Sequence, residues 1–129
     1  MANTKKFQEP DFLKKMTSEE KRDYFKISTN LVEGIGVTYS IGSDAYAYHV
    51  TEVIKPGKMV KIQQLHEVNT GDWFGDQNWE LFIPENNNSC RYLKFWKGSW
   101  KECYENGNLT HSCGYYHVGY AHSRRDPSF

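Results

Sequence analysis

Apolar and polar positions alternate with a period of two through much of the chain after Gly34. The alternation runs from Ile35 to Ile41, recurs from Ala45 to Ile54 and again from Met59 to Leu65. A period of two is typical of half-buried strands, because successive side chains point to opposite faces of a sheet. Short Gly- and Pro-containing turns separate the three segments. We therefore predict a three-stranded antiparallel meander over residues 35–65.

Four further strands are expected in the second half of the chain, separated by Pro-, Gly- and Asn-rich turns. They cover Trp79–Ile83, Cys90–Trp96, Trp100–Tyr104 and Tyr115–Tyr120. Neither an internal repeat nor a linker divides the sequence. We predict one domain over residues 1–129 with a β-rich body at 34–129. The expected fold class is mainly β (α+β), a small antiparallel sheet or partly open barrel.

The N-terminal part has a different pattern. Residues 1–8 are polar and are expected to be flexible. The sequence Thr17-Ser18-Glu19-Glu20 is a capping box, in which Thr17 and Glu20 satisfy each other's backbone amides at the start of a helix. We predict a short helical segment over residues 11–27.

The aromatic content, net charge and cysteine number restrict the classes of function to expect. Aromatic residues make up 16% of the 129 residues, so much of the apolar bulk is carried by rings. Tyr and Trp suit ligand pockets and interfaces, although in a small β-protein most rings form the core. Lys plus Arg and Asp plus Glu are both 16, so no net field favours a nucleic acid polymer or an anionic membrane. Three cysteines, no apolar leader and no long apolar run predict a reducing cytoplasm.

The sequence gives little evidence for a catalytic site or a metal site. Cys103, His111, Cys113 and His117 lie close in sequence, but their spacing does not match the paired ligands of structural zinc sites. Half-buried cysteines and surface histidines are the favoured interpretation. No nucleophile motif and no phosphate loop occurs. We expect no catalytic residues, no metal and no cofactor.

Ligand binding has better candidates. Two of the few arginines, Arg124 and Arg125, are adjacent near the C-terminus and could contact phosphate or stack on a base, although a solvated pair is the usual interpretation. Phe82 is the preferred residue for stacking on adenine. The further candidate ligand-binding residues are Trp73, Phe74, Tyr46, Tyr120 and Asp126. Trp73 and Phe74 lie in a predicted loop, where large exposed rings are often functional, although the loop could instead fold down over the core.

Two segments carry a resemblance to a known family. The segment Ile41–Val53 with the Gly57-Lys58 turn, and the ending Arg125-Asp126-Pro127-Ser128-Phe129, resemble small phage proteins, the Thoeris anti-defence proteins of the first-described type. The resemblance spans Gly36 to Phe129 and is concentrated at its two ends. It implies a sponge that sequesters gcADPR, a cyclic ADP-ribose isomer made by a TIR-domain enzyme, without cleaving it. It also implies a homo-oligomer, a dimer or hexamer, with pockets at subunit interfaces.

The expected function is therefore sequestration of a small nucleotide signal in the cytoplasm of an infected bacterium, with no nucleic acid polymer or membrane as partner. A phage inhibitor that binds a host protein through an aromatic-rich surface is the alternative. A small enzyme that degrades the signal is the third hypothesis, and the sequence supports it least.

Overall fold

The computed structural model describes residues 5–27, 30–85, 90–111 and 114–126. The helices are α1 (Asp11–Lys14) and α2 (Ser18–Ile27), and the strands are β1 (Lys5–Lys6), β2 (Gly36–Ile41), β3 (Asp44–Lys55), β4 (Met59–Gln64), β5 (His66–Asn69), β6 (Trp79–Ile83), β7 (Cys90–Trp96), β8 (Ser99–Cys103) and β9 (Tyr115–Val118). The fold is mostly β, as the alternation predicts, so the predicted fold class is confirmed.

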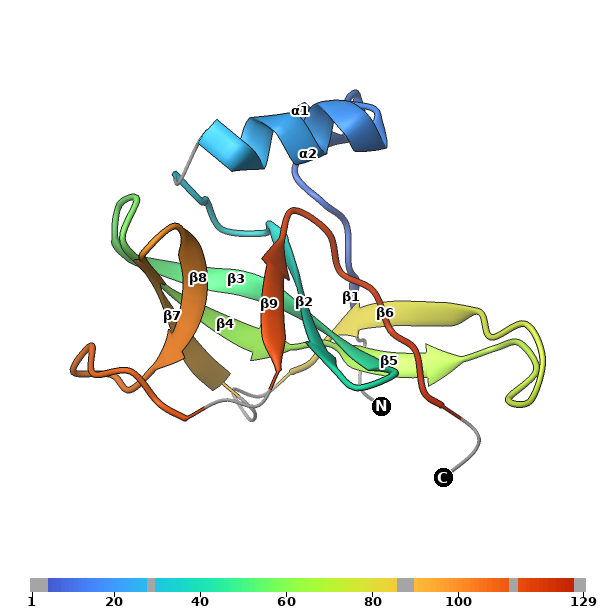
Figure 1. The fold of residues 1–129 in the computed structure, drawn as a ribbon. Coiled ribbons are helices and arrows are strands. Elements are labelled where there is room, and N and C mark those ends of the chain that lie inside the picture. The colour runs from blue at the N-terminus through green and yellow to red at the C-terminus, as the bar shows by residue number, and fades with distance from the viewer. Residues whose placement is uncertain (1–4, 28–29, 86–89, 112–113, 127–129) are drawn as a thin grey trace.

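The strands form two antiparallel sheets. Six of them pair in the order β8-β7-β4-β3-β2-β9 and curl into a nearly closed, barrel-like sheet. The other three pair in the order β1-β6-β5. In Figure 1 the helices lie across one end of the barrel-like sheet, and the β5–β6 hairpin projects to one side with the C-terminal segment running beside it.

The side chains on the inner face of the six-stranded sheet change from apolar to polar along the strands. Near the helices this face is apolar, and Val37, Val50 and Leu93 pack there with Leu13 from α1. Burying each such side chain contributes about 1.5–3 kcal/mol to folding. One step further along β2 from Val37, the inward position is Tyr39, whose partners on β3 and β9 are Tyr46 and Tyr116. The barrel therefore has an apolar end under the helices and a polar, tyrosine-rich end opposite.

Most predicted strands are confirmed. Strands β2, β3 and β4 form the expected meander, and β6 and β7 have the predicted bounds. The sequence pattern did not reveal β5, because its four residues His66–Asn69 follow β4 after a single buried residue, Leu65, with no turn signal between.

The N-terminal region differs from the prediction in two respects. The helical segment is broken into α1 and α2, because the Thr17 capping box begins a new helix rather than continuing one. Lys5 and Lys6, in the segment expected to be flexible, pair with Ile83 and Phe82 of β6. The adjacent Phe7 amide donates to the Leu81 carbonyl at 2.8 Å. Residues 1–4 lie outside the described residues.

Candidate functional site

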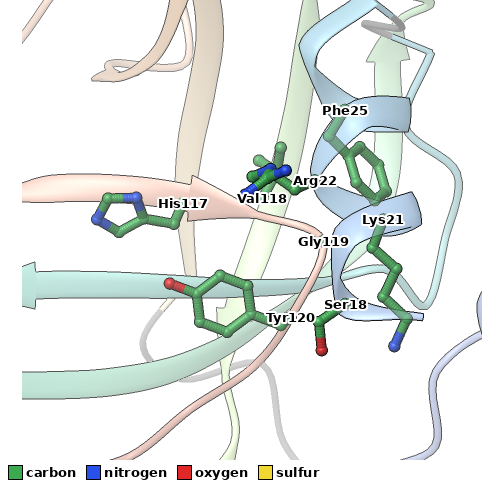
Figure 2. A pocket seen from close by; sticks show the side chains of 8 residues that line it. All are labelled: Ser18, Lys21, Arg22, Phe25, His117, Val118, Gly119 and Tyr120. Carbon is green, nitrogen blue, oxygen red and sulfur yellow. The ribbon is translucent and has the colours of Figure 1, made fainter. Parts of the chain in front are cut away.

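A groove lies between α2 and β9. Its volume is about 630 Å³, within the usual size range of small-molecule sites. It is lined by Ser18, Lys21, Arg22 and Phe25 from the helix, and by His117, Val118, Gly119 and Tyr120 from the strand and the residues after it (Figure 2).

Local sequence explains why the helix lies beside this strand. The Thr17 hydroxyl accepts from the Glu20 amide at 3.1 Å, and the Glu20 carboxylate accepts from the Thr17 amide at 2.9 Å, which fixes the start of α2. Arg22 and Phe25 then fall three residues apart on one side of the helix. The Phe25 ring packs against Gly119, where a Cβ atom would lie 2.7 Å from the ring. Only glycine allows this approach, and its φ of +111° also requires glycine.

The two basic side chains of the groove differ in availability. Lys21 makes an ion pair with Glu9 at 2.8 Å, and both side chains are mostly buried. Arg22 is 62% exposed, and its contacts to Glu19 and Asp23 are long, at 3.7 and 3.6 Å. Exposed ion pairs of this kind contribute little and exchange readily. Arg22 is therefore the cation of the groove that can bind an anionic group.

Two rings form a platform at the other side of the groove. The His117 and Tyr120 rings are stacked, with centroids 6.4 Å apart and an interplanar angle of 23°. The backbone that carries them is fixed, because the Gly119 amide donates to the Gly36 carbonyl at 2.8 Å and the Thr38 hydroxyl donates to the Tyr120 carbonyl at 2.8 Å. Tyr120 is 49% exposed, so its ring face can receive a planar ligand.

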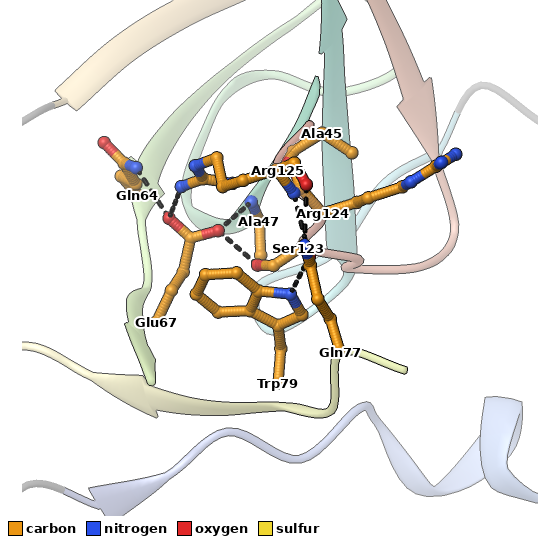
Figure 3. A network of polar contacts seen from close by, with 9 residues as sticks. All are labelled: Ala45, Ala47, Gln64, Glu67, Gln77, Trp79, Ser123, Arg124 and Arg125. Carbon is orange, nitrogen blue, oxygen red and sulfur yellow. Dashed lines mark hydrogen bonds and ion pairs between the residues drawn. The ribbon is translucent and has the colours of Figure 1, made fainter. Parts of the chain in front are cut away.

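The predicted ligand residue Arg125 lies elsewhere, in a buried polar network (Figure 3). Its guanidinium donates to the Glu67 carboxylate at 3.0 Å and to the Ala45 carbonyl at 2.6 Å. Glu67 is also bonded by Gln64 at 2.8 Å, by the Ala47 amide at 3.2 Å and by the Ser123 hydroxyl. The network joins the C-terminal segment to both sheets.

Aromatic contacts complete this network. The Arg125 guanidinium lies 3.8 Å from the centroid of the Tyr46 ring and 5.2 Å from that of Trp79. The Gln77 side-chain oxygen accepts from the Arg125 amide at 3.0 Å and from the Trp79 indole N–H at 3.0 Å. The Gln77 side-chain amide donates to the Arg125 carbonyl at 2.7 Å. The side chains of Arg125 and Tyr46 are therefore engaged with each other and with neighbouring groups of the protein.

The other predicted residues lie on β6 and on the C-terminal segment. Phe82 is in β6, where its ring centroid is 6.3 Å from that of His66. Arg124 pairs through its backbone with Ala45, and its side chain is exposed. The Asp126 amide donates to Asp44 at 2.7 Å. Residues 127–129, which carry part of the family resemblance, lie outside the described residues.

Trp73 and Phe74 occupy the tip of the β5–β6 hairpin, with exposed fractions of 42% and 79%. The loop is held by its own polar groups, including the Asp72 carboxylate, which accepts from the Phe74 amide at 3.1 Å. Of the eight predicted ligand residues, only Tyr120 lines the α2–β9 groove. Arg22 and Phe25 were missed, because the sequence places them on a helix without indicating which strand that helix contacts.

Among the described residues, no group of three or more His, Cys, Asp or Glu side chains is placed to hold a metal ion. Cys103 is buried and His111 and His117 are exposed, while Cys113 lies outside the described residues. Burial raises the pKa of the Cys103 thiol above its ordinary value, with Lys94 opposing this effect and Glu102 adding to it.

No described helix has the length and apolar character that crossing a bilayer requires. Comparison of the chain with protein-family models, with curated proteins and with solved structures gave no match.

Proposed function

We propose that this chain is a phage anti-defence protein that binds and sequesters a small nucleotide, gcADPR or a closely related cyclic ADP-ribose isomer, without cleaving it. The observation that carries the proposal is the α2–β9 groove, whose lining combines an available arginine with a pair of near-parallel aromatic rings. In this proposal the protein acts in the cytoplasm of the infected bacterium and suppresses Thoeris immunity by removing the signal.

The groove offers the two interactions that a nucleotide needs. Arg22 can donate a planar fork to phosphate oxygens, a charge-assisted contact that no neutral side chain provides. The exposed Tyr120 ring, with His117 beside it, can stack on the adenine for roughly 1–3 kcal/mol. The Ser18 hydroxyl lies in the same lining and can bond a ribose or phosphate oxygen. Donors and ring faces of this kind hold a ligand without attacking it.

Titration calorimetry with gcADPR tests this assignment. Wild type should bind, and Arg22→Ala and Tyr120→Ala should each weaken binding by roughly 10- to 100-fold, which corresponds to the loss of one charged hydrogen bond or one stack. Arg124→Ala is the matched control, because it removes an exposed arginine outside the groove. Wild-type affinity in both groove variants would place the site elsewhere, and no binding by wild type would refute the proposal.

We also propose that the chain assembles into a homo-oligomer, a dimer or a hexamer. In such an assembly a second copy could cover the open side of the groove. Mass measurement in solution, with and without ligand, tests it, and a monomer in both conditions would contradict it.

The second candidate function is inhibition of a host protein. It is favoured by the tip of the β5–β6 hairpin, where Phe74 is 79% exposed on a loop held rigid by its own hydrogen bonds. Pre-organised aromatic residues of this kind are frequent anchors of protein interfaces. Trp73→Ser/Phe74→Ser should abolish capture of a host protein under this function, and should leave gcADPR binding intact under the first.

A further inference from the structure

A second arginine, Arg91, lies at the polar, tyrosine-rich end of the barrel interior. It extends inward from β7, beside the position of Ile62 on β4. Its guanidinium carbon is 5.0 Å from the centroid of the Tyr39 ring and 5.4 Å from that of Tyr48. Contacts to two rings restrict the plane of the guanidinium and stabilise its charge without using any of its hydrogen-bond donors.

One edge of this guanidinium is held by a short polar relay. Arg91 Nη1 donates to the Tyr116 hydroxyl at 2.6 Å, and that hydroxyl donates to Glu102 Oε1 at 2.6 Å. Nη1 also lies 3.3 Å from the same carboxylate oxygen. Burial lowers the pKa of Arg91, but the Tyr116 hydrogen bond and the charges around it outweigh burial and hold the pKa above its ordinary value. The guanidinium is therefore charged and fixed in place.

The other edge is not used by the protein. Within the described residues every hydrogen bond of the Arg91 side chain goes through Nη1, which leaves the Nε and Nη2 donors without a partner. The side chain is 36% exposed, so a solute can reach it. Arg125 differs on both counts, because it is 18% exposed and its two terminal nitrogens bond Glu67 and Ala45.

We propose that Arg91 forms a second binding site, separate from the α2–β9 groove, which takes an oxyanion with two oxygens spaced for a fork, a carboxylate or a phosphate. The guanidinium fork offers parallel N–H groups that match such an anion bidentately. The rings of Tyr39 and Tyr48 and the bond to Tyr116 position the fork before the ligand arrives, which reduces the entropy lost on binding. Glu102 offsets part of the positive charge, so the site selects for shape and hydrogen bonding rather than for charge alone.

Arginine-detected NMR provides the test, since the only arginines are Arg22, Arg91, Arg124 and Arg125 and each Nε–H signal can be assigned. Protein free of phosphate is titrated with inorganic phosphate in one series and with acetate in another, at constant ionic strength. We expect a saturable shift of the Arg91 Nε–H signal while the exposed Arg124 signal moves only linearly. The series that saturates at lower concentration identifies the preferred source, phosphate or carboxylate.

Two variants distinguish anion binding at Arg91 from binding in the α2–β9 groove and from a purely structural role of Arg91. Arg22→Ala should leave the Arg91 titration unchanged. Tyr116→Phe removes the positioning hydroxyl and should weaken anion binding at Arg91 about 10-fold, the effect of losing one charge-assisted contact. An Arg91 signal that follows Arg124 in both series would overturn the proposal, as would saturation that disappears with Arg22→Ala. The wild-type titration gives this answer even if Tyr116→Phe fails to fold.

Discussion

Substitution of Arg125 by alanine is the sharpest test of the network that joins the C-terminal segment to the two sheets. Two side chains lose their partner. Glu67, which is only 6% exposed, loses its ion pair at 3.0 Å, and the Tyr46 ring loses the guanidinium 3.8 Å above it. The Ala45 carbonyl loses its 2.6 Å contact as well. The variant should therefore be much less stable than the position of Arg125 near the chain end would suggest.

The size of the stability loss depends on the Glu67 carboxylate that remains buried after Arg125 is removed. Breaking a buried ion pair from one side costs about 3–5 kcal/mol, because the other charge is left without compensation. Glu67 retains donors from Gln64, Ala47 and Ser123, so the lower end applies. We expect a loss of about 3 kcal/mol in the free energy of unfolding, or roughly 10 °C in the unfolding midpoint.

Urea unfolding followed by tryptophan fluorescence measures this difference. Arg124→Ala is the matched control: its side chain is exposed and only its backbone pairs with Ala45, so its stability should change by less than about 0.5 kcal/mol. Arg125→Lys keeps the charge but loses the planar stack and one contact, and should fall between the two. Equal stability of the two alanine variants would refute the structural role of Arg125.

Three other predictions concern single groups. Burial lowers the pKa of His49, and its contact to Gln63 opposes this, so the imidazole is neutral in the fold at neutral pH. The His49 contribution to stability should therefore be full above about pH 6.5 and be lost as the pH falls below it. Urea unfolding midpoints at pH 7.5 and 5.5 measure this dependence, which His49→Gln should reduce. Gly119→Ala should cost about 1–3 kcal/mol and weaken gcADPR binding, since its Cβ would meet Phe25; unchanged calorimetric affinity would contradict the groove. Thr17→Ala should cost about 1 kcal/mol in thermal unfolding, whereas an unchanged midpoint would show that the cap contributes nothing.

The sequence predicts strands where one face is buried and the other polar, because alternation records burial directly. It thus predicts the meander from Ile35 to Leu65 and the strand Trp79–Ile83. It fails for β1 and β5, which are too short to show a period and are held by pairing with β6. Short paired segments depend on a distant partner, which local pattern does not encode.

The candidate site was less predictable for the same reason. The sequence indicated arginine and exposed aromatic rings as candidate ligand contacts, but not which of them lie together in the fold. Arg125 was predicted to contact ligand, and its partner Glu67 lies 58 positions earlier in the chain. Arg22 had no distinguishing feature within α2, and only the packing of Phe25 on Gly119 brings it beside Tyr120. Contacts made across the fold decide which arginine is available.

We propose that the chain holds a cyclic ADP-ribose isomer intact in the α2–β9 groove. To test this most directly, the protein is mixed with gcADPR, free nucleotide is removed by gel filtration, the protein is denatured by heat and the released molecule is identified by mass spectrometry. We expect release of unaltered gcADPR from wild type and from Arg124→Ala, and little from Arg22→Ala. Release of a hydrolysed product would indicate an enzyme, and wild-type protein that releases no nucleotide would refute sequestration.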